Sequence, residues 1–259
     1  MVTGIVLTHN SESTLARTLT SLSFCDEIIV VDDYSVDKTR DIAQSFNARV
    51  FRRHLESDFS AQRNFALAKA KGGEWVLFVD SDEVVSSELA SEIKKATGRQ
   101  TQDVRRKTQD AGMSGYFLKR KDFFGGKWLA HGETADVRLL RLARVHAGVW
   151  KRPIHETWEI NEPVGVLHAP LLHYSHEDIA QFIERIDSYS TLNARFFYKQ
   201  GKRAGFISIF AYPAAKFFLN YVLRFGFLDG TAGAVMAIIM SFHSFLTRGK
   251  LYFLWQYGL

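Results

Sequence analysis

Three carboxylates stand together directly after an apolar run in the first third of the chain. The run covers residues 75–79, and Asp80, Asp82 and Glu83 follow it. Five consecutive apolar residues predict a buried strand, and open α/β sheets bind ligands at the carboxyl ends of such strands. Two carboxylates spaced like Asp80 and Asp82 can share a Mg²⁺ or Mn²⁺ ion, whose remaining ligands are water and substrate phosphates. The segment predicts a metal–diphosphate site, with an ordinary solvated strand end as the alternative.

Strands and helices alternate over about the first hundred residues, and these elements must position the carboxylates. Polar residues 10–13 are suited to capping a helix whose apolar side is Leu15, Leu19 and Leu22. A second apolar strand also ends in acids, Asp32 and Asp33. The alternation predicts a parallel sheet covered by helices. The predicted strands lie in residues 4–10, 28–31, 48–51 and 75–79, and the clearest predicted helix spans 59–70.

Four short motifs occur in order over residues 1–90. They lie at residues 7–10, 30–39, 61–64 and 80–82. In this order and spacing they resemble the family 2 glycosyltransferases with a GT-A fold. The resemblance implies an α/β fold with a Rossmann-like, mixed and mostly parallel sheet covered by helices. It also implies a metal-dependent, inverting transfer of a hexose from a nucleotide diphosphate sugar, most simply a UDP-sugar.

The resemblance assigns binding roles to polar residues of these motifs. A metal ion on the diphosphate would stabilise the negative charge that develops on the leaving group. For Asp33 an acid that interacts with a helix dipole is an equal alternative, and an Arg on a helix face is often only solvated. The nucleotide ligands implied are Thr8, Asn10, Asp33, Arg63 and Asp80, and the metal ligands implied are Asp82 and Asp80.

Transfer to a hydroxyl with inversion also needs a general base. Many family members use a Glu-Asp pair downstream of the metal motif, and residues 92–150 contain none. Residues 152–156 instead resemble those of the lipopolysaccharide-core glucosyltransferases and their relatives, in which a His-Glu element supplies the catalytic acid. Glu156 is therefore the candidate base, and His155 would orient it or contact phosphate. A polar loop beyond a strand is the alternative for both residues.

A histidine is the expected third metal ligand. His168, His173 and His176 cluster around an apolar segment. By analogy with GT-A enzymes that use a third ligand, His173 would complete the metal shell. The three spacings do not predict a zinc site, because no cysteine or helical ligand pair accompanies them.

Changes in composition divide the chain. We expect a GT-A catalytic domain over residues 1–177, with a nucleotide-binding half at 1–97 and an acceptor half at 113–177. The polar, basic stretch 98–110 between the halves predicts a mobile loop. Residues 178–259 predict a helical, membrane-associating extension. Within it, residues 230–247 carry no formal charge but are too polar for a confident span. Aromatic residues flanked by Lys and Arg favour the membrane interface, with a core helix pair or a dimer interface as alternatives.

The 259 residues carry a net charge of +5 and one cysteine, Cys25, which excludes an internal disulfide and gives no sign of secretion. No nucleic-acid-binding motif accompanies the basic charge. The expected partners are a nucleotide-sugar donor, a lipid-linked or lipopolysaccharide-core glycan acceptor and a membrane surface. The expected location is the cytoplasmic face of the inner membrane. The alternatives are a haloacid-dehalogenase-type phosphohydrolase that uses Asp80, a sugar nucleotidyltransferase and a catalytically inactive nucleotide-binding membrane module.

Overall fold

The computed structural model describes residues 1–70, 72, 74–98, 112–153, 156–176 and 179–258. The chain forms two compact units. Unit 1 comprises Met1–Arg120 and Arg138–His173, and unit 2 comprises Lys121–Val137 and Tyr174–Leu259. The predicted acceptor half, residues 113–177, is therefore divided between the units. Most of the predicted loop 98–110 lies outside the described residues.

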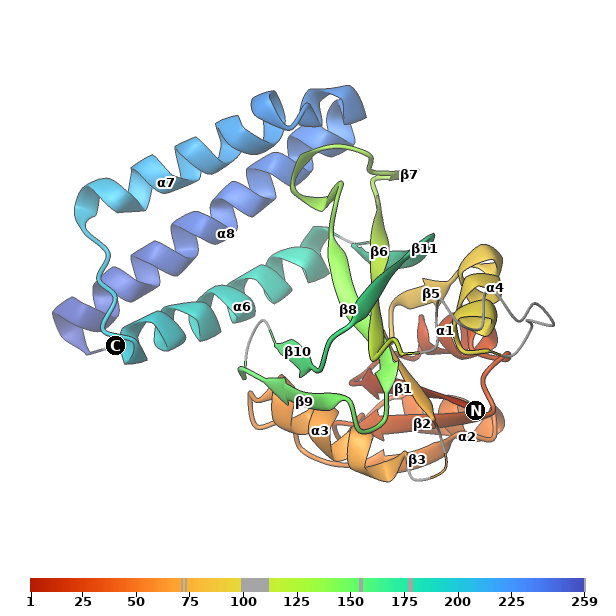
Figure 1. The fold of residues 1–259 in the computed structure, drawn as a ribbon. Coiled ribbons are helices and arrows are strands. Elements are labelled where there is room, and N and C mark those ends of the chain that lie inside the picture. Colours follow the sequence, from red (N-terminus) through yellow and green to blue (C-terminus); the bar gives the residue numbers. More distant parts are fainter. Residues whose placement is uncertain (71, 73, 99–111, 154–155, 177–178, 259) are drawn as a thin grey trace. The chain divides into compact units, whose positions relative to one another are not determined.

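Unit 1 is built on a mixed sheet covered by helices, as the sequence predicts (Figure 1). Its parallel part has the order β3-β2-β1-β4, and β8, β6, β11 and β5 continue the sheet beyond β4. Strand β4 pairs in parallel with β1 and antiparallel with β8, so the parallel part ends at β4. The first strands are β1 Val2–Thr8, β2 Glu27–Asp32, β3 Arg49–Arg52, β4 Trp75–Asp80 and β5 Glu83–Val85. The later ones are β6 Gly115–Phe124, β7 Lys127–Trp128, β8 Arg138–Arg144 and β11 Val164–His176, with a separate hairpin of β9 Gly148–Lys151 and β10 Thr157–Ile160.

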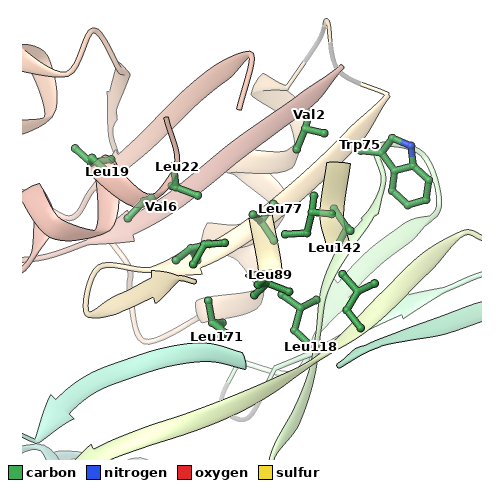
Figure 2. Close-up of a cluster of buried hydrophobic side chains, with 14 of the residues drawn as sticks. Val2, Val6, Leu19, Leu22, Trp75, Leu77, Leu89, Leu118, Leu142 and Leu171 are labelled. Atoms are coloured by element: carbon green, nitrogen blue, oxygen red, sulfur yellow. The ribbon is translucent and has the colours of Figure 1, made fainter. Parts of the chain in front are cut away.

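Both faces of the central strands are buried. Neighbouring residues of a strand point to opposite faces, and in β1 the side chains of Ile5 and Val6 belong to two different apolar clusters. Leu77 and Phe78 of β4 divide in the same way. Figure 2 shows the cluster that contains Val6 and Leu77. Burial on both faces explains why the sequence of β4 is apolar without interruption and fixes the position of the acids that follow it.

Local hydrogen bonds set where the helices of unit 1 begin. Helix α3 is capped by Asp58, whose carboxylate accepts from Ala61 N, and α4 by Ser86, which accepts from Leu89 N. The predicted capping of α1 by residues 10–13 is wrong, because α1 has no side-chain cap. The side chains of Asn10 and Glu12 instead accept from Val36 N and Lys38 N in the loop that follows β2. The helices are α1 Leu15–Ser21, α2 Thr39–Ser45, α3 Phe59–Lys69 and α4 Ser87–Ala96.

Unit 2 is largely helical, as predicted for the C-terminal region. Helix α8 lies between α6 and α7 (Figure 1). An apolar cluster that includes Phe124, Phe182 and Met236 joins α6, α8 and the end of β6. Two segments, Phe206–Leu223 and Gly226–Tyr257, are long and apolar enough to cross a membrane by length and composition alone. The helices are α6 Ile179–Lys199, α7 Phe206–Phe218 and α8 Gly230–Tyr257, with the short turns η1 Gly132–Thr134, η2 Leu219–Leu223 and η3 Gly226–Asp229.

Candidate functional site

The polar residues that follow β1 and β2 lie together. Asp33 donates its backbone N–H to the Thr8 carbonyl at 2.9 Å. The Asn10 side-chain oxygen accepts from Val36 N at 2.9 Å, and Asn10 N donates to the Ser35 hydroxyl at 2.9 Å. The structure thus brings together the three residues predicted to line a base pocket. The buried Thr8 hydroxyl has no hydrogen-bond partner among the described residues.

The two acids that end β2 have different environments. Asp32 is 1% exposed and accepts from the backbone N–H and the hydroxyl of Ser35, so it stabilises the turn. Asp33 is more accessible, and its carboxylate accepts from Leu55 N at 3.1 Å. Helix α2 begins six residues later at Thr39, so the helix-dipole alternative for Asp33 is wrong. Asp33 is therefore the acid that can meet a ligand.

An aromatic stack borders Asp33. The rings of Tyr34 and His54 are parallel, with centroids 3.8 Å apart, and the Arg52 guanidinium lies 4.2 Å from the Tyr34 centroid. His54 Nδ1 lies 3.5 Å from the Asp33 carboxylate. A flat aromatic surface beside a hydrogen-bond acceptor is suited to a planar heterocyclic base.

Two buried arginines hold Asp80. Arg63 Nη2 lies 2.8 Å from Asp80 Oδ1, and Arg141 Nη2 lies 2.6 Å from Oδ2. Partial burial would raise the pKa of Asp80, but the Arg141 and Arg63 guanidiniums outweigh it and hold that pKa well below its usual range. Arg63 is 2% exposed, so the alternative of a solvated helix-face arginine is wrong.

Arg63 also holds Glu156. Its Nε and Nη2 atoms lie 2.9 and 2.8 Å from Glu156 Oε1. The same guanidinium lies 4.7 Å from the ring centroid of Trp150, which fixes its plane. One arginine of α3 therefore joins the strand-end Asp80 to an acid that is 76 residues further along the chain. His155, the predicted neighbour of Glu156, lies outside the described residues.

Asp82 and His173, two of the predicted metal ligands, lie close together. His173 Nε2 lies 3.6 Å from Asp82 Oδ1, and both side chains are mostly buried. The pairing of β5 with β11 sets His173 opposite Glu83 and so places it beside the acid cluster. His168 instead donates its backbone N–H to Glu92, and His176 has no described side chain.

This donor set fits a divalent cation whose shell a substrate completes. The described residues contain no group of three or more His, Cys, Asp or Glu side chains that could hold a metal ion. One carboxylate and one imidazole leave the other positions to water and phosphate oxygens, as is usual for Mg²⁺. The residues present therefore fit a Mg²⁺ or Mn²⁺ ion only together with a diphosphate.

The contacts of two residues in this network, Arg141 and Glu83, were not predicted from the sequence, although Glu83 was placed among the acids that follow residue 79. Arg141 is 6% exposed, and a charged residue among the apolar residues of β8 was the available signal. Glu83 is fully buried, and its Oε2 accepts from Asp80 N at 2.9 Å. Burial first, and the Asp80 carboxylate second, raise the pKa of Glu83. The contact of Glu83 with Asp80 N depends on the backbone path of β5, and no sequence motif marks that strand.

Comparison with known proteins identifies the family. The model of glycosyl transferase family 2 matches residues 3–138, which is more than half of the chain and contains the loops after β1 and β2, Arg63 and Asp80. The chain belongs to glycosyl transferase family 2. This membership leaves no place for the phosphohydrolase and nucleotidyltransferase alternatives.

Relatives of this glycosyltransferase extend over nearly its whole length. An uncharacterized glycosyltransferase of Rickettsia bellii is 28% identical and covers 96% of this chain and 85% of that one. The lipopolysaccharide core biosynthesis glycosyltransferase LpsC of Rhizobium meliloti is 24% identical and covers 97% and 92%.

A third relative supports the fold. The poly(ribitol-phosphate) beta-N-acetylglucosaminyltransferase TarS of Staphylococcus aureus is 39% identical over 95 residues, which are 32% of this chain and 16% of TarS. The crystal structure of TarS 1–349 superposes with a TM-score of 0.50 at 17% identity, covering 100% of this chain and 92% of that one. At this identity the superposition shows the GT-A fold.

Proposed function

We propose that this glycosyltransferase moves a hexose from a UDP-sugar to a hydroxyl of a lipid-linked or lipopolysaccharide-core glycan, with inversion at the sugar carbon. The contact that carries the proposal is Arg63, which lies within 2.8 Å of both Asp80 and Glu156. Through these two ion pairs, Glu156, the acid suited to base catalysis, lies beside Asp80 at the end of β4, where the diphosphate would bind.

The base and the diphosphate of the donor would meet different parts of unit 1. Asp33 can accept a hydrogen bond from a base imide or a ribose hydroxyl, with the Tyr34–His54 stack beside it. Thr8 and Asn10 would complete that pocket. The diphosphate would lie at the end of β4, where a metal ion would balance its charge, because Arg63 and Arg141 are already paired with Asp80 and Glu156.

Asp82 and His173 would hold the divalent ion, Mg²⁺ or Mn²⁺. When bound, such an ion stabilises the negative charge on the departing diphosphate. Asp80 has both oxygens occupied by guanidiniums, so we assign it to positioning Arg63 and Arg141 rather than to direct metal contact.

Glu156 would accept the proton of the attacking hydroxyl. The hydroxyl oxygen forms a bond to the anomeric carbon as the bond from that carbon to the diphosphate oxygen breaks, and the nucleoside diphosphate leaves with that electron pair. Arg63 keeps the Glu156 carboxylate oriented through a hydrogen bond from Nε and an ion pair from Nη2 to the same oxygen. His155 would orient Glu156 further or contact phosphate.

Replacement of the candidate base tests this assignment. Glu156→Gln should lower the transfer rate by roughly 10²- to 10⁴-fold, the usual contribution of a general base, while nucleotide binding stays near normal. Glu159→Gln is the matched control, because Glu159 lies in the same hairpin, is exposed and pairs with Lys151 at the surface. Unchanged turnover in Glu156→Gln would overturn the base assignment, and nucleotide binding without turnover in the wild type would favour an inactive binding module.

The acceptor and the location follow from the relatives and the C-terminal unit. LpsC is a lipopolysaccharide core biosynthesis glycosyltransferase by name, and its similarity covers 97% of this chain. A glycan of that kind is held at a membrane by its lipid. We therefore assign the enzyme to the cytoplasmic face of the inner membrane as a peripheral protein.

A further inference from the structure

The edge formed by α7, η2 and η3, residues 206–229, is mostly apolar and yet exposed. Among the described residues, 19 of the 25 exposed large apolar side chains belong to unit 2, and 11 of them lie in this edge. Ile207 is 80% exposed, Phe206 69% and Leu223 58%. Only 11% of the segment 206–223 is buried, although its mean hydropathy is 1.4. A helix that is hydrophobic all round is stable in a core or in lipid, not in water.

The net positive charge of the chain comes from the C-terminal residues 190–259, which include this edge. Residues 190–259 contain eight Lys or Arg and one acid, Asp229, a net charge of +7. Because the whole chain carries +5, residues 1–189 carry −2. Lys202 and Arg203 precede α7, and Arg224 follows it. Cations at both ends of an apolar helix match a surface of anionic headgroups.

The polar groups of the edge are satisfied within unit 2. The carboxylate of Asp229 accepts from the backbone N–H groups of residues 130–131 at 3.0 and 2.8 Å. Glu133 accepts from Asn220 at 3.1 Å and pairs with Lys216 at 3.1 Å. Asp229, the one acid of the edge, is thus turned inward, and the exposed residues of the edge are Phe, Leu, Ile, Val and Ala, with Tyr212 and Arg224. An apolar environment at this surface would leave no buried acid without a partner.

Helix α6 decides between a helix that crosses the membrane and one that lies in its interface. It packs on α8 on the side away from α7 (Figure 1). Its outer face carries the exposed charged residues Glu184 and Arg195, and the exposed Asp187 at its flank pairs with Lys250 of α8. A hairpin of α7 and α8 that crossed the bilayer would draw this face into hydrocarbon, where each charge is costly.

We propose that the edge α7–η2–η3 inserts into one leaflet of an anionic membrane without crossing it, and that α6 stays in water. The apolar side chains 206–228 would enter the interface, and the basic residues at both ends of α7 would contact lipid phosphates. This inference rests on the proposed function, whose lipid-linked acceptor is held at a membrane, and it names the surface that would bind that membrane. Vesicle binding needs neither donor nor acceptor, so its failure would be distinct from a failure of the transferase assignment.

Flotation with vesicles tests the surface. The full chain should float with vesicles of phosphatidylethanolamine and phosphatidylglycerol, less with phosphatidylcholine alone, and less in high salt. The triple variant Ile207→Asp, Leu223→Asp, Leu228→Asp should lower the partition coefficient at least about tenfold. Val149→Asp, an exposed apolar residue of unit 1, is the matched control. Equal flotation of the triple variant and the control, with circular dichroism unchanged, would overturn the proposal.

Fluorophores at two positions distinguish insertion into one leaflet from a spanning arrangement and from contact with a second copy of the chain. In a Cys25→Ser background, an environment-sensitive fluorophore on Leu223→Cys should shift to the blue when vesicles are added. The same fluorophore on Arg195→Cys, on the outer face of α6, should not shift. Blue shifts at both positions would indicate a spanning arrangement. A shift at Leu223→Cys that depends on protein concentration without vesicles would indicate a second copy of the chain. Both of these results would overturn the proposal.

Discussion

The two units differ in which side chains depart from ordinary packing: unit 1 buries charged side chains, and unit 2 exposes large apolar ones. Unit 1 buries charge: Arg63, Arg141 and Glu83 are at most 6% exposed, and its surface carries only 6 of the 25 exposed large apolar side chains of the described residues. Unit 2 exposes the other 19, and Asp229, the one acid of its edge 206–229, is turned inward. Buried ionic networks are weak evidence for stability, and exposed apolar surfaces are weak evidence for a soluble core. Each departure from ordinary packing therefore marks the part of the molecule that meets something else.

The largest expected effect on stability comes from breaking the buried ionic network of unit 1. Arg141→Met should lower the free energy of unfolding by about 3 kcal/mol, the lower end for a broken buried pair, because Asp80 keeps Arg63 as a partner. Urea denaturation measures it. Arg144→Met in the same strand is the control, because Arg144 pairs with the exposed Glu74, and its loss should cost about 1 kcal/mol or less. Equal losses in the two variants would remove the contrast between buried and surface charge.

A smaller effect is expected at the inward acid of unit 2. Asp229→Ala leaves two backbone N–H groups of residues 130–131 without their acceptor, which should cost about 2 kcal/mol. It should weaken vesicle flotation and leave nucleotide binding unchanged. Asp187→Ala is the control, since Asp187 is exposed and pairs with Lys250. Loss of nucleotide binding in Asp229→Ala would show that the units are not separable in function.

The smallest effect concerns the helix that carries Arg63. Asp58→Ala should lower the stability by about 1 kcal/mol at pH 7, because it removes the cap of α3. Burial would raise the pKa of Asp58, but hydrogen bonds from Ser60 and Ala61 outweigh it and lower that pKa below 3.8. The stabilisation is therefore complete above the unfolded pKa and is lost as the pH falls through the lower folded value.

Denaturation of Asp58→Ala at pH 7 and at successively lower pH measures this effect. The difference from the wild type should shrink below about pH 4. Asp58→Asn should keep most of the cap and lose the pH dependence. A difference that grows as the pH falls would contradict the assignment of the cap.

The sequence predicted the parts of the fold and site that depend on local pattern. The apolar run of β4, the acids after it and the helix from Phe59 follow from composition over a few residues, and the structure has them at these positions. His173 was expected as a metal ligand only by analogy with GT-A enzymes that use a third ligand, and in the structure it lies 3.6 Å from Asp82. Their roles in metal and nucleotide binding stay predictions.

Long-range pairing explains what could not be predicted. The sequence around Arg63 allows a solvated residue, because its partner Glu156 comes from a distant hairpin. Arg141 reaches Asp80 through the pairing of β8 with β4, and Asn10 and Glu12 bond to the loop after β2 rather than to their own helix. The edge formed by α7, η2 and η3 is apolar in the sequence. Its exposure depends on how α7 packs on α8, which the sequence does not show.

The most direct test of the transferase site is the melting temperature in the presence of UDP, GDP, CDP or ADP, each with and without Mn²⁺. A ligand that binds only the native state stabilises it by RT ln(1 + [L]/Kd). We predict a Mn²⁺-dependent shift with UDP that is lost in Asp82→Ala and kept in Glu74→Gln, which changes an exposed acid just before the other end of β4. The absence of a shift with every nucleotide, or an equal shift in Asp82→Ala, would contradict the account.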